Sequence, residues 1–186
     1  MFLKRFLLVA SAVAMLLCSG CSTYRTTPYS ASIDNAEALQ LLSAKPIGVG
    51  VFSATTPTNQ IQCMAVGPMT TQNEGQFSEY IRTAFISDLR LAKLYSPSAT
   101  LLLTGNVDSM DFHAAGSTGE WNIVVSITSS NGKKLSVVER YHFPSNGFFL
   151  GEAACTDTAA AFLPAVQSLI GKVVNSREFP ALISRE

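Results

Sequence analysis

The stretch WNIVVSITSSNGKKLSVVERYHF, residues 121–143, alternates apolar and polar side chains on both sides of an Asn-Gly turn, which is typical of a β-hairpin. A two-residue loop would set Ile127 opposite Ser136 and mix apolar with polar side chains. A three-residue loop with Gly132 in the left-handed conformation buries one apolar face, so we expect this register. It pairs Ile127 with Leu135, Val125 with Val137 and Trp121 with Tyr141.

Two further strands are expected before this hairpin. In TLLLTGNVDSMDF, residues 100–112, the apolar positions run 101, 103 and 107 and then shift to 110 and 112. A change of phase in a period of two indicates an extra residue, so a β-bulge is predicted near Asp108-Ser109. In KPIGVGVF, residues 45–52, we expect Ile47, Val49 and Val51 on one side of a strand.

Two long segments have the period of an amphipathic helix. Residues 77–95 carry the clearest apolar stripe, formed by Phe77, Ile81, Ala84, Phe85, Leu89 and Ala92. Residues 154–174 form the second helix, which Thr156 or Asp157 should cap and Pro164 should kink or start. Its buried stripe should contain Phe162, Val166, Leu169, Ile170 and Val173, and a terminal turn should place Phe179, Leu182 and Ile183 on the body. The predicted fold class is α+β, a two-layer sandwich in which an antiparallel-rich sheet carries two long helices packed on one face.

The amino-terminal segment has the pattern of a secretory signal. Lys4 and Arg5 precede an apolar run at residues 6–17, which is about half the roughly 20 residues that a membrane-spanning helix needs. The residues Cys18-Ser19-Gly20-Cys21 then resemble the lipobox of bacterial lipoproteins, although Cys18 stands where that family usually has leucine.

The resemblance implies that residues 1–20 are removed and that Cys21, carrying three acyl chains, becomes the first mature residue. In that family Ser22 favours the outer membrane, so we expect a lipid-anchored protein on its periplasmic face. The alternative is an ordinary signal peptide that is cut nearby.

Residues 22–33 are rich in Ser, Thr and Tyr and have no apolar period, which predicts a flexible tether that spans roughly 20 Å. A short helix at residues 36–44, capped by Asp34 or Asn35, should follow. We therefore expect the lipidated cysteine, tether and short helix in residues 21–45 and one α+β domain in residues 46–186.

The charge of the chain argues against nucleic-acid binding, and its cysteine content predicts a disulfide. The chain has 13 basic and 13 acidic residues, and loss of Lys4 and Arg5 leaves 11 basic residues and a net charge near −2. The basic residues are scattered, so no nucleic-acid partner is expected. In an oxidising compartment the two cysteines of the body, Cys63 and Cys155, should form a disulfide, and two free thiols are the alternative.

The sequence offers little catalytic chemistry. It lacks GxSxG, HExxH, Walker and dinucleotide-binding motifs, so neither an enzyme nor a cofactor is expected. Asp108, Asp111 and His113 superficially resemble a metal-binding set, but a solvated strand end explains them more simply. Glu139 and Arg140 are interpreted as polar residues on the outer face of the sheet.

Two loops could contact a partner. Residues 53–76 lack a clear period, although QIQCMAV (60–66) could form a short edge strand, and Met64, Val66 and Met69 in this loop are either core or contact residues. Phe148 and Phe149 pose the same choice, because they either plug the end of the core or form a docking patch. The residues expected to contact a partner are Met64, Met69, Phe148 and Phe149.

The order of elements resembles the small α/β domains of the curli secretion lipoprotein, of the Tol-system propeller protein and of auxiliary lipoproteins of lipid transport, over most of residues 46–175. Fold likeness does not transfer function. The expected function is that of a non-catalytic accessory or assembly subunit of a cell-envelope complex, held on the membrane and bound to another envelope protein. The alternative is a periplasmic lipoprotein that binds a lipid or another apolar ligand.

Overall fold

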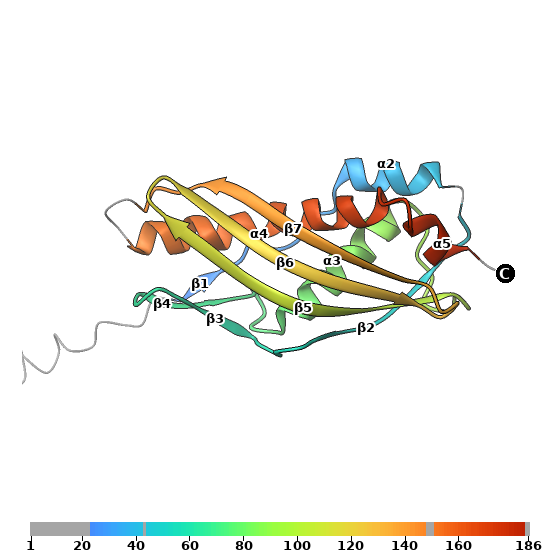
Figure 1. Cartoon of the computed structure of the whole chain (residues 1–186), viewed down its shortest axis with the longest axis horizontal. Coiled ribbons are helices and arrows are strands. Elements are labelled where there is room, and N and C mark those ends of the chain that lie inside the picture. The colour runs from blue at the N-terminus through green and yellow to red at the C-terminus, as the bar shows by residue number, and fades with distance from the viewer. Residues whose placement is uncertain (1–22, 43, 148–150, 185–186) are drawn as a thin grey trace, which may run out of the picture.

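The computed structural model describes residues 23–42, 44–147 and 151–184. The main sheet contains four strands in the order β2-β5-β6-β7. Their bounds are Gly48–Ala54 for β2, Leu102–Ala115 for β5, Thr118–Ser129 for β6 and Lys134–Pro144 for β7. β2 is parallel to β5, and the other pairs are antiparallel. The helices α3 (Phe77–Leu91) and α4 (Gly151–Val174) lie against one face of this sheet (Figure 1), which confirms the predicted α+β sandwich.

The hairpin of β6 and β7 has the predicted register. Ile127 faces Leu135, Val125 faces Val137 and Trp121 faces Tyr141. Gly132 has a φ of 86°, in the left-handed region where a side chain would be strained. The three-residue loop therefore keeps a single face of the hairpin apolar.

The predicted bulge in β5 is also present, because its pairing with β6 shifts between Val107 and Ser109. A second irregularity, in β2 between Val49 and Phe52, was not predicted. As a result Val51 is 73% exposed while Phe52 is buried, so the prediction that Val51 shares a side of the strand with Ile47 and Val49 was wrong. Gly105 makes this possible, since a Cβ there would lie 2.6 Å from the Phe52 ring.

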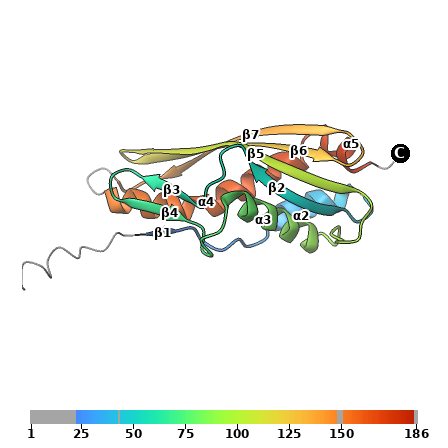
Figure 2. The ribbon, with the colours of Figure 1, turned by 90° about the horizontal axis from the view of Figure 1, so that it is seen from below.

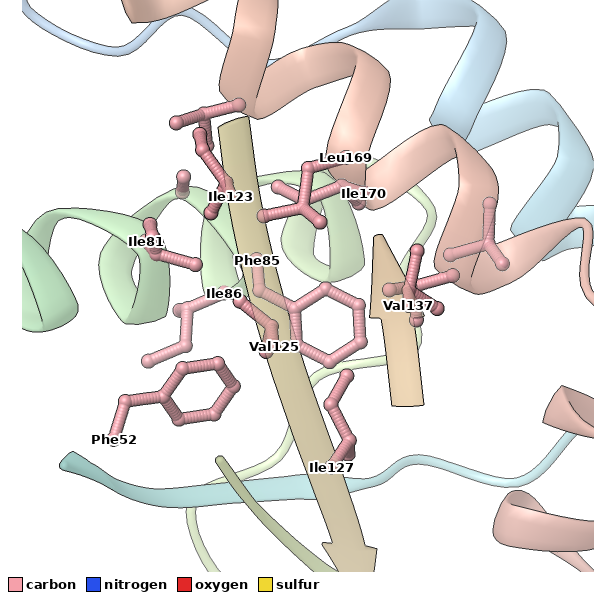
Figure 3. Packing of buried hydrophobic residues seen from close by; sticks show 14 of the residues in the cluster. Phe52, Ile81, Phe85, Ile86, Ile123, Val125, Ile127, Val137, Leu169 and Ile170 are labelled. Carbon is pink, nitrogen blue, oxygen red and sulfur yellow. The ribbon is translucent and has the colours of Figure 1, made fainter. Parts of the chain in front are cut away.

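The core forms where the helical stripes meet the inner face of the sheet. Phe85 of α3 lies among Val125, Ile127 and Leu169 (Figure 3). The predicted stripe residues of both helices are buried, and so are Phe179, Leu182 and Ile183 around the terminal helix α5 (Phe179–Ile183).

α4 differs from its prediction in where it begins. It starts at Gly151, so Thr156 and Asp157 lie inside it and Pro164 is an interior residue. The Thr156 hydroxyl donates to the Glu152 carbonyl one turn earlier, which is a bond within a helix rather than a cap. α4 is long and apolar enough to cross a membrane, but most of its large apolar side chains are buried inside the protein, as expected of a core helix.

A second, three-stranded sheet has the order β1-β4-β3. It consists of β1 (Tyr24–Arg25), β3 (Gln60–Cys63) and β4 (Gly67–Thr70). β3 corresponds to the edge strand predicted within residues 60–66, whereas β4 and β1 were not predicted. Figure 2 shows this small sheet on the opposite side of α4 from the main sheet, so the first half of α4 is covered on two sides.

The predicted flexible tether is wrong for residues 24–32. β1 pairs with β4, Thr26 is 2% exposed, and the Tyr29 hydroxyl donates to Asp88 on α3. The short helix is α2 (Ile33–Leu41), which is capped by Ser32 rather than Asp34 or Asn35 and packs on α3 and α4. The boundary expected at residue 46 therefore does not separate a tether from a domain, because the strap of residues 23–32 belongs to the folded body.

Candidate interaction surface

The amino terminus of the described chain lies at the end of the molecule that contains the small sheet (Figures 1 and 2). Cys21 is outside the described residues, but β1 begins only three residues after it, at Tyr24. Three residues of extended chain reach about 10 Å. A group bonded to Cys21 would therefore lie within about 10 Å of chain from the start of β1.

The predicted disulfide is present at this same end. Cys63, the last residue of β3, is bonded to Cys155 in α4, with a distance of 5.9 Å between the two Cα atoms, and both residues are fully buried. The bond joins the β3–β4 hairpin to the first half of α4.

The predicted contact residues do not share one environment. Met64 is 45% exposed in the turn between β3 and β4, so it remains available for contact. Met69 is fully buried in β4, and its prediction as a contact residue was wrong because its side chain lies on the core face of the small sheet. Phe148 and Phe149 lie outside the described residues. Val66 approaches the start of α4, since a Cβ on Gly151 would lie 2.8 Å from its Cγ2 atom.

A groove separates the small sheet from the far half of β5. One hollow of about 400 Å³ has Ile61, Gln62 and Met64 on one side and residues 110–114 of β5 on the other. It adjoins a hollow of about 280 Å³ between the β5 bulge and the start of α3, because Met110 and Asp111 line both. We call these two hollows together the β3–β5 groove.

The structure places Asp108, Asp111 and His113 along β5 without assembling them into a metal site. The Asp108 carboxylate accepts hydrogen bonds from Ser126 at 2.6 Å and from Asn106 at 2.7 Å. Asp111 accepts from the side-chain amide of Asn122 at 3.2 Å, and His113 pairs with Glu120 in the strand register. Within the described ranges no three side chains of the metal-ligating types come together.

The sequence interpretation missed a buried polar cluster behind the strap. Asp88 is fully buried and accepts hydrogen bonds from the Tyr29 hydroxyl at 2.9 Å, the Ser32 N–H at 3.0 Å and the Asn35 amide at 2.9 Å. Burial raises the pKa of Asp88, and these three hydrogen bonds partly oppose the rise. Burial and the neighbouring Asp88 raise the pKa of Tyr29 as well. A carboxylate that is enclosed in this way stabilises the strap and is not positioned to react with a substrate.

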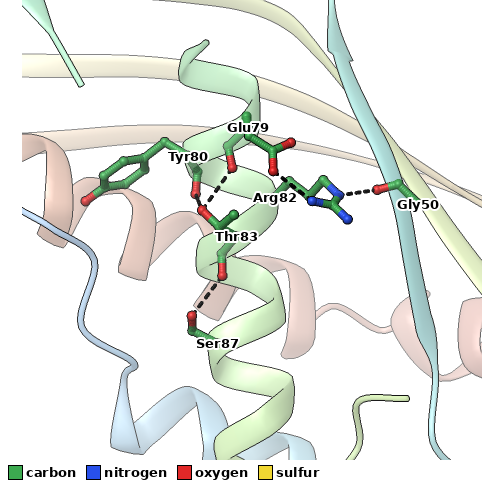
Figure 4. Close-up of polar contacts among 6 residues, drawn as sticks. All are labelled: Gly50, Glu79, Tyr80, Arg82, Thr83 and Ser87. Carbon is green, nitrogen blue, oxygen red and sulfur yellow. Dashed lines mark hydrogen bonds and ion pairs between the residues drawn. The ribbon is translucent and has the colours of Figure 1, made fainter. Parts of the chain in front are cut away.

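Another hollow, of about 310 Å³, lies over the exposed face of α3 beside the strap. The polar side chains of α3 near it are satisfied within the protein (Figure 4). Thr83 and Ser87 donate to carbonyls of their own helix, and Arg82 donates to the Gly50 carbonyl at 2.6 Å and pairs with Glu79. These groups do not converge on a ligand.

Glu139 was expected on the outer face of the sheet, and this prediction was wrong. It is 2% exposed, accepts from the Ser168 hydroxyl at 3.1 Å and pairs with Lys172 at 3.2 Å. Both partners come from α4, so the carboxylate joins β7 to that helix. Arg140 is exposed, as expected.

No family model and no curated protein matches this sequence. Its fold is similar to the crystal structure of protein XCC0632 from Xanthomonas campestris, described by the family model DUF330. The TM-score is 0.52 at 12% sequence identity, and the alignment covers 82% of this chain and 95% of the other. The likeness shows a shared fold and carries no residue roles.

Proposed function

We propose that this protein is a lipid-anchored lipoprotein on the periplasmic face of the bacterial outer membrane. In this proposal it serves as a non-catalytic accessory or assembly subunit of a cell-envelope complex. The carrying observation is the position of Cys21, which ends a lipobox-like signal and lies three residues before the first strand of the folded body. Lipid at Cys21 would hold the small sheet against the bilayer.

Two features of the folded body support this proposal. A buried disulfide is typical of an oxidising compartment such as the periplasm. The buried acid Asp88 is enclosed by hydrogen bonds from the strap and α2, and it lines none of the described hollows. The enclosed Asp88 is therefore not presented to any of these hollows.

The alternative function, binding of a lipid or another apolar ligand, is supported by the β3–β5 groove. Ile61, Met110 and Phe112 are only partly buried there and pack on the core beneath. Native mass spectrometry of gently extracted protein separates the two functions. A reproducible bound small molecule favours ligand binding, and a co-purifying protein favours the accessory role.

The anchor is tested by intact mass spectrometry of the detergent-extracted protein. We expect a mature chain that begins at Cys21 and carries three acyl chains. Cys21→Ser should abolish the lipid mass and release the protein from the membrane, because one residue carries the whole anchor. Cys18→Ser is the matched control and should leave the lipid mass unchanged. An unmodified amino terminus at any other residue contradicts the anchor.

A further inference from the structure

The two edges of β5 form strand pairs of unequal length. One edge pairs with β6 along the whole strand, from Leu103 to Ala115. The other pairs with β2 only between Leu102 and Val107, and the Thr55 N–H adds a last bond to the Val107 carbonyl. Within the described chain, no backbone group bonds to this second edge over residues 109–114. Alternate residues of a strand turn their N–H and C=O groups to the same edge, so among the described residues those on this edge of β5 beyond the bulge have no strand partner.

The opposite wall of the groove is also the edge of a sheet. β3 pairs with β4 on one side only, because the small sheet has the order β1-β4-β3. Exposed strand edges of this kind accept further strands from other chains.

The side chains of the groove alternate in character. Ile61, Met110 and Phe112 form an apolar floor and remain partly exposed. Asp111 and His113 lie between them in sequence and are exposed at the rim. Neither Asp108 nor Asp111 forms an ion pair among the described residues, and no lysine or arginine lines the groove.

We propose that the β3–β5 groove binds an extended segment of a partner protein, which pairs with β5 beyond the bulge, where β2 leaves its edge. Apolar side chains of the segment face Ile61, Met110 and Phe112, and cationic side chains on alternate positions face Asp111 and Asp108. The main-chain bonds supply affinity and the alternating side chains supply specificity, as in other cases of strand addition. This inference rests on the accessory function proposed above and names the kind of segment that the partner presents.

A second copy of this chain is a poorer occupant than a basic segment. Pairing two copies through the same edge of β5 would bring together the acidic side chains of both copies, including Asp111. Like charges directly opposite each other destabilise a pair of strands. A segment that carries lysine or arginine on alternate positions replaces this repulsion by attraction between opposite charges.

The probe is a synthetic peptide of about ten residues with alternating valine and lysine, a usual strand length. Its control has the same composition with the valines in one block. Each is added to the mature, full-length protein in detergent, and backbone hydrogen exchange is followed by mass spectrometry. We expect the alternating peptide to slow exchange in residues 109–114 about tenfold or more, because newly bonded amides are protected. The free edge of β7 should be unaffected.

Two charge variants test the proposed polarity. Asp111→Lys should weaken binding of the alternating peptide about tenfold or more, because it sets lysine against lysine. Glu37→Lys makes the same charge change on the exposed face of α2 and should leave binding unchanged.

The inference is overturned if the alternating peptide leaves residues 109–114 unprotected, if the block peptide protects them equally, or if protection appears at β7 instead. Equal loss of binding in both charge variants overturns it too, since attraction would then be non-specific. The intact mass of the same sample reports lipid at Cys21 independently. An anchored protein with an unprotected groove therefore contradicts this inference and leaves the proposed function standing.

Discussion

Asp88 shows how one buried carboxylate organises distant parts of the chain. It lies on α3 and binds Tyr29 and Ser32 of the strap and Asn35 of α2. Asn35 also donates to the Gln167 carbonyl of α4 at 2.9 Å. Three elements and the strap therefore meet at one polar cluster, and its loss should loosen all of them together.

We expect Asp88→Ala to lower the free energy of unfolding by about 3 kcal/mol or more, because it removes the shared acceptor of three hydrogen bonds from Tyr29, Ser32 and Asn35. Urea denaturation monitored by circular dichroism measures this change. Glu37→Ala on the exposed face of α2 is the control and should change stability by less than about 0.5 kcal/mol. An Asp88→Ala variant that is as stable as the wild type would show that the polar cluster does not hold the strap in place.

The same residue predicts a pH dependence of stability. Because burial raises the folded-state pKa of Asp88 above 3.8, the folded protein binds this proton more tightly than the unfolded chain does. The stabilisation is fully present below pH 3.8 and is lost as the pH rises through the folded pKa. The unfolding free energy of the wild type minus that of Asp88→Asn should therefore fall from pH 3.5 toward neutrality. A difference that rises with pH contradicts the raised pKa.

At the scale of elements, the disulfide decides how the small sheet is attached. β3 and β4 form a short hairpin, and a hairpin alone is marginally stable in water. Its covalent link to α4 closes a sequence separation of 92 residues. The β3–β4 hairpin forms one wall of the β3–β5 groove, so the position of that wall depends on the disulfide.

Replacing both Cys63 and Cys155 by alanine should lower the free energy of unfolding by about 4 kcal/mol, from the lost restriction of the unfolded chain. Thermal denaturation of the variant and of the wild type measures it. Reduction of the wild type is the matched comparison and should cause a similar loss. We also expect the double variant to exchange backbone hydrogens faster than the wild type, with a larger increase in β3 and β4 than in β6. An equal increase in all strands would contradict a local role of the disulfide in holding the hairpin.

At the scale of the whole molecule, the strap changes how the protein would stand on a membrane. A flexible tether of a dozen residues would leave a gap of roughly 20 Å. Because β1 begins three residues after Cys21, an anchor there would instead place the small sheet and the exposed Met64 next to the bilayer. One end of the molecule would then face the lipid and the opposite end would face the periplasm.

Replacing residues 23–31 of the mature protein by glycine and serine should lower the free energy of unfolding by about 3 kcal/mol or more. The change removes the pairing of β1 and the bond from Tyr29 to Asp88. Inserting the same linker between Ser22 and Thr23 is the control and should be neutral. Denaturant titration in detergent compares them, and equal stability of both variants would restore the interpretation of residues 23–31 as a tether.

The parts of the fold that rest on contiguous periodic patterns were predictable from the sequence. The register of β6 and β7, the bulge near Asp108 and the buried stripes of α3 and α4 each follow from the spacing of apolar side chains within one segment. The disulfide followed from a count of cysteines and the expected compartment. Of the candidate surface, only the exposure of Met64 could be anticipated, and only as one of two choices.

The remaining features required the tertiary structure because their stabilising partners are far away in the chain. Tyr29 reaches Asp88 across 59 residues, so a polar segment without a period of its own becomes ordered. Phe52 turns inward because Gly105 of β5 makes room for it, and Glu139 turns inward because α4 supplies Ser168 and Lys172. The β3–β5 groove exists because two sheets end beside each other. Local spacing determines which segments form strands and helices, whereas long-range packing decides which polar groups are buried and which strand edges remain open.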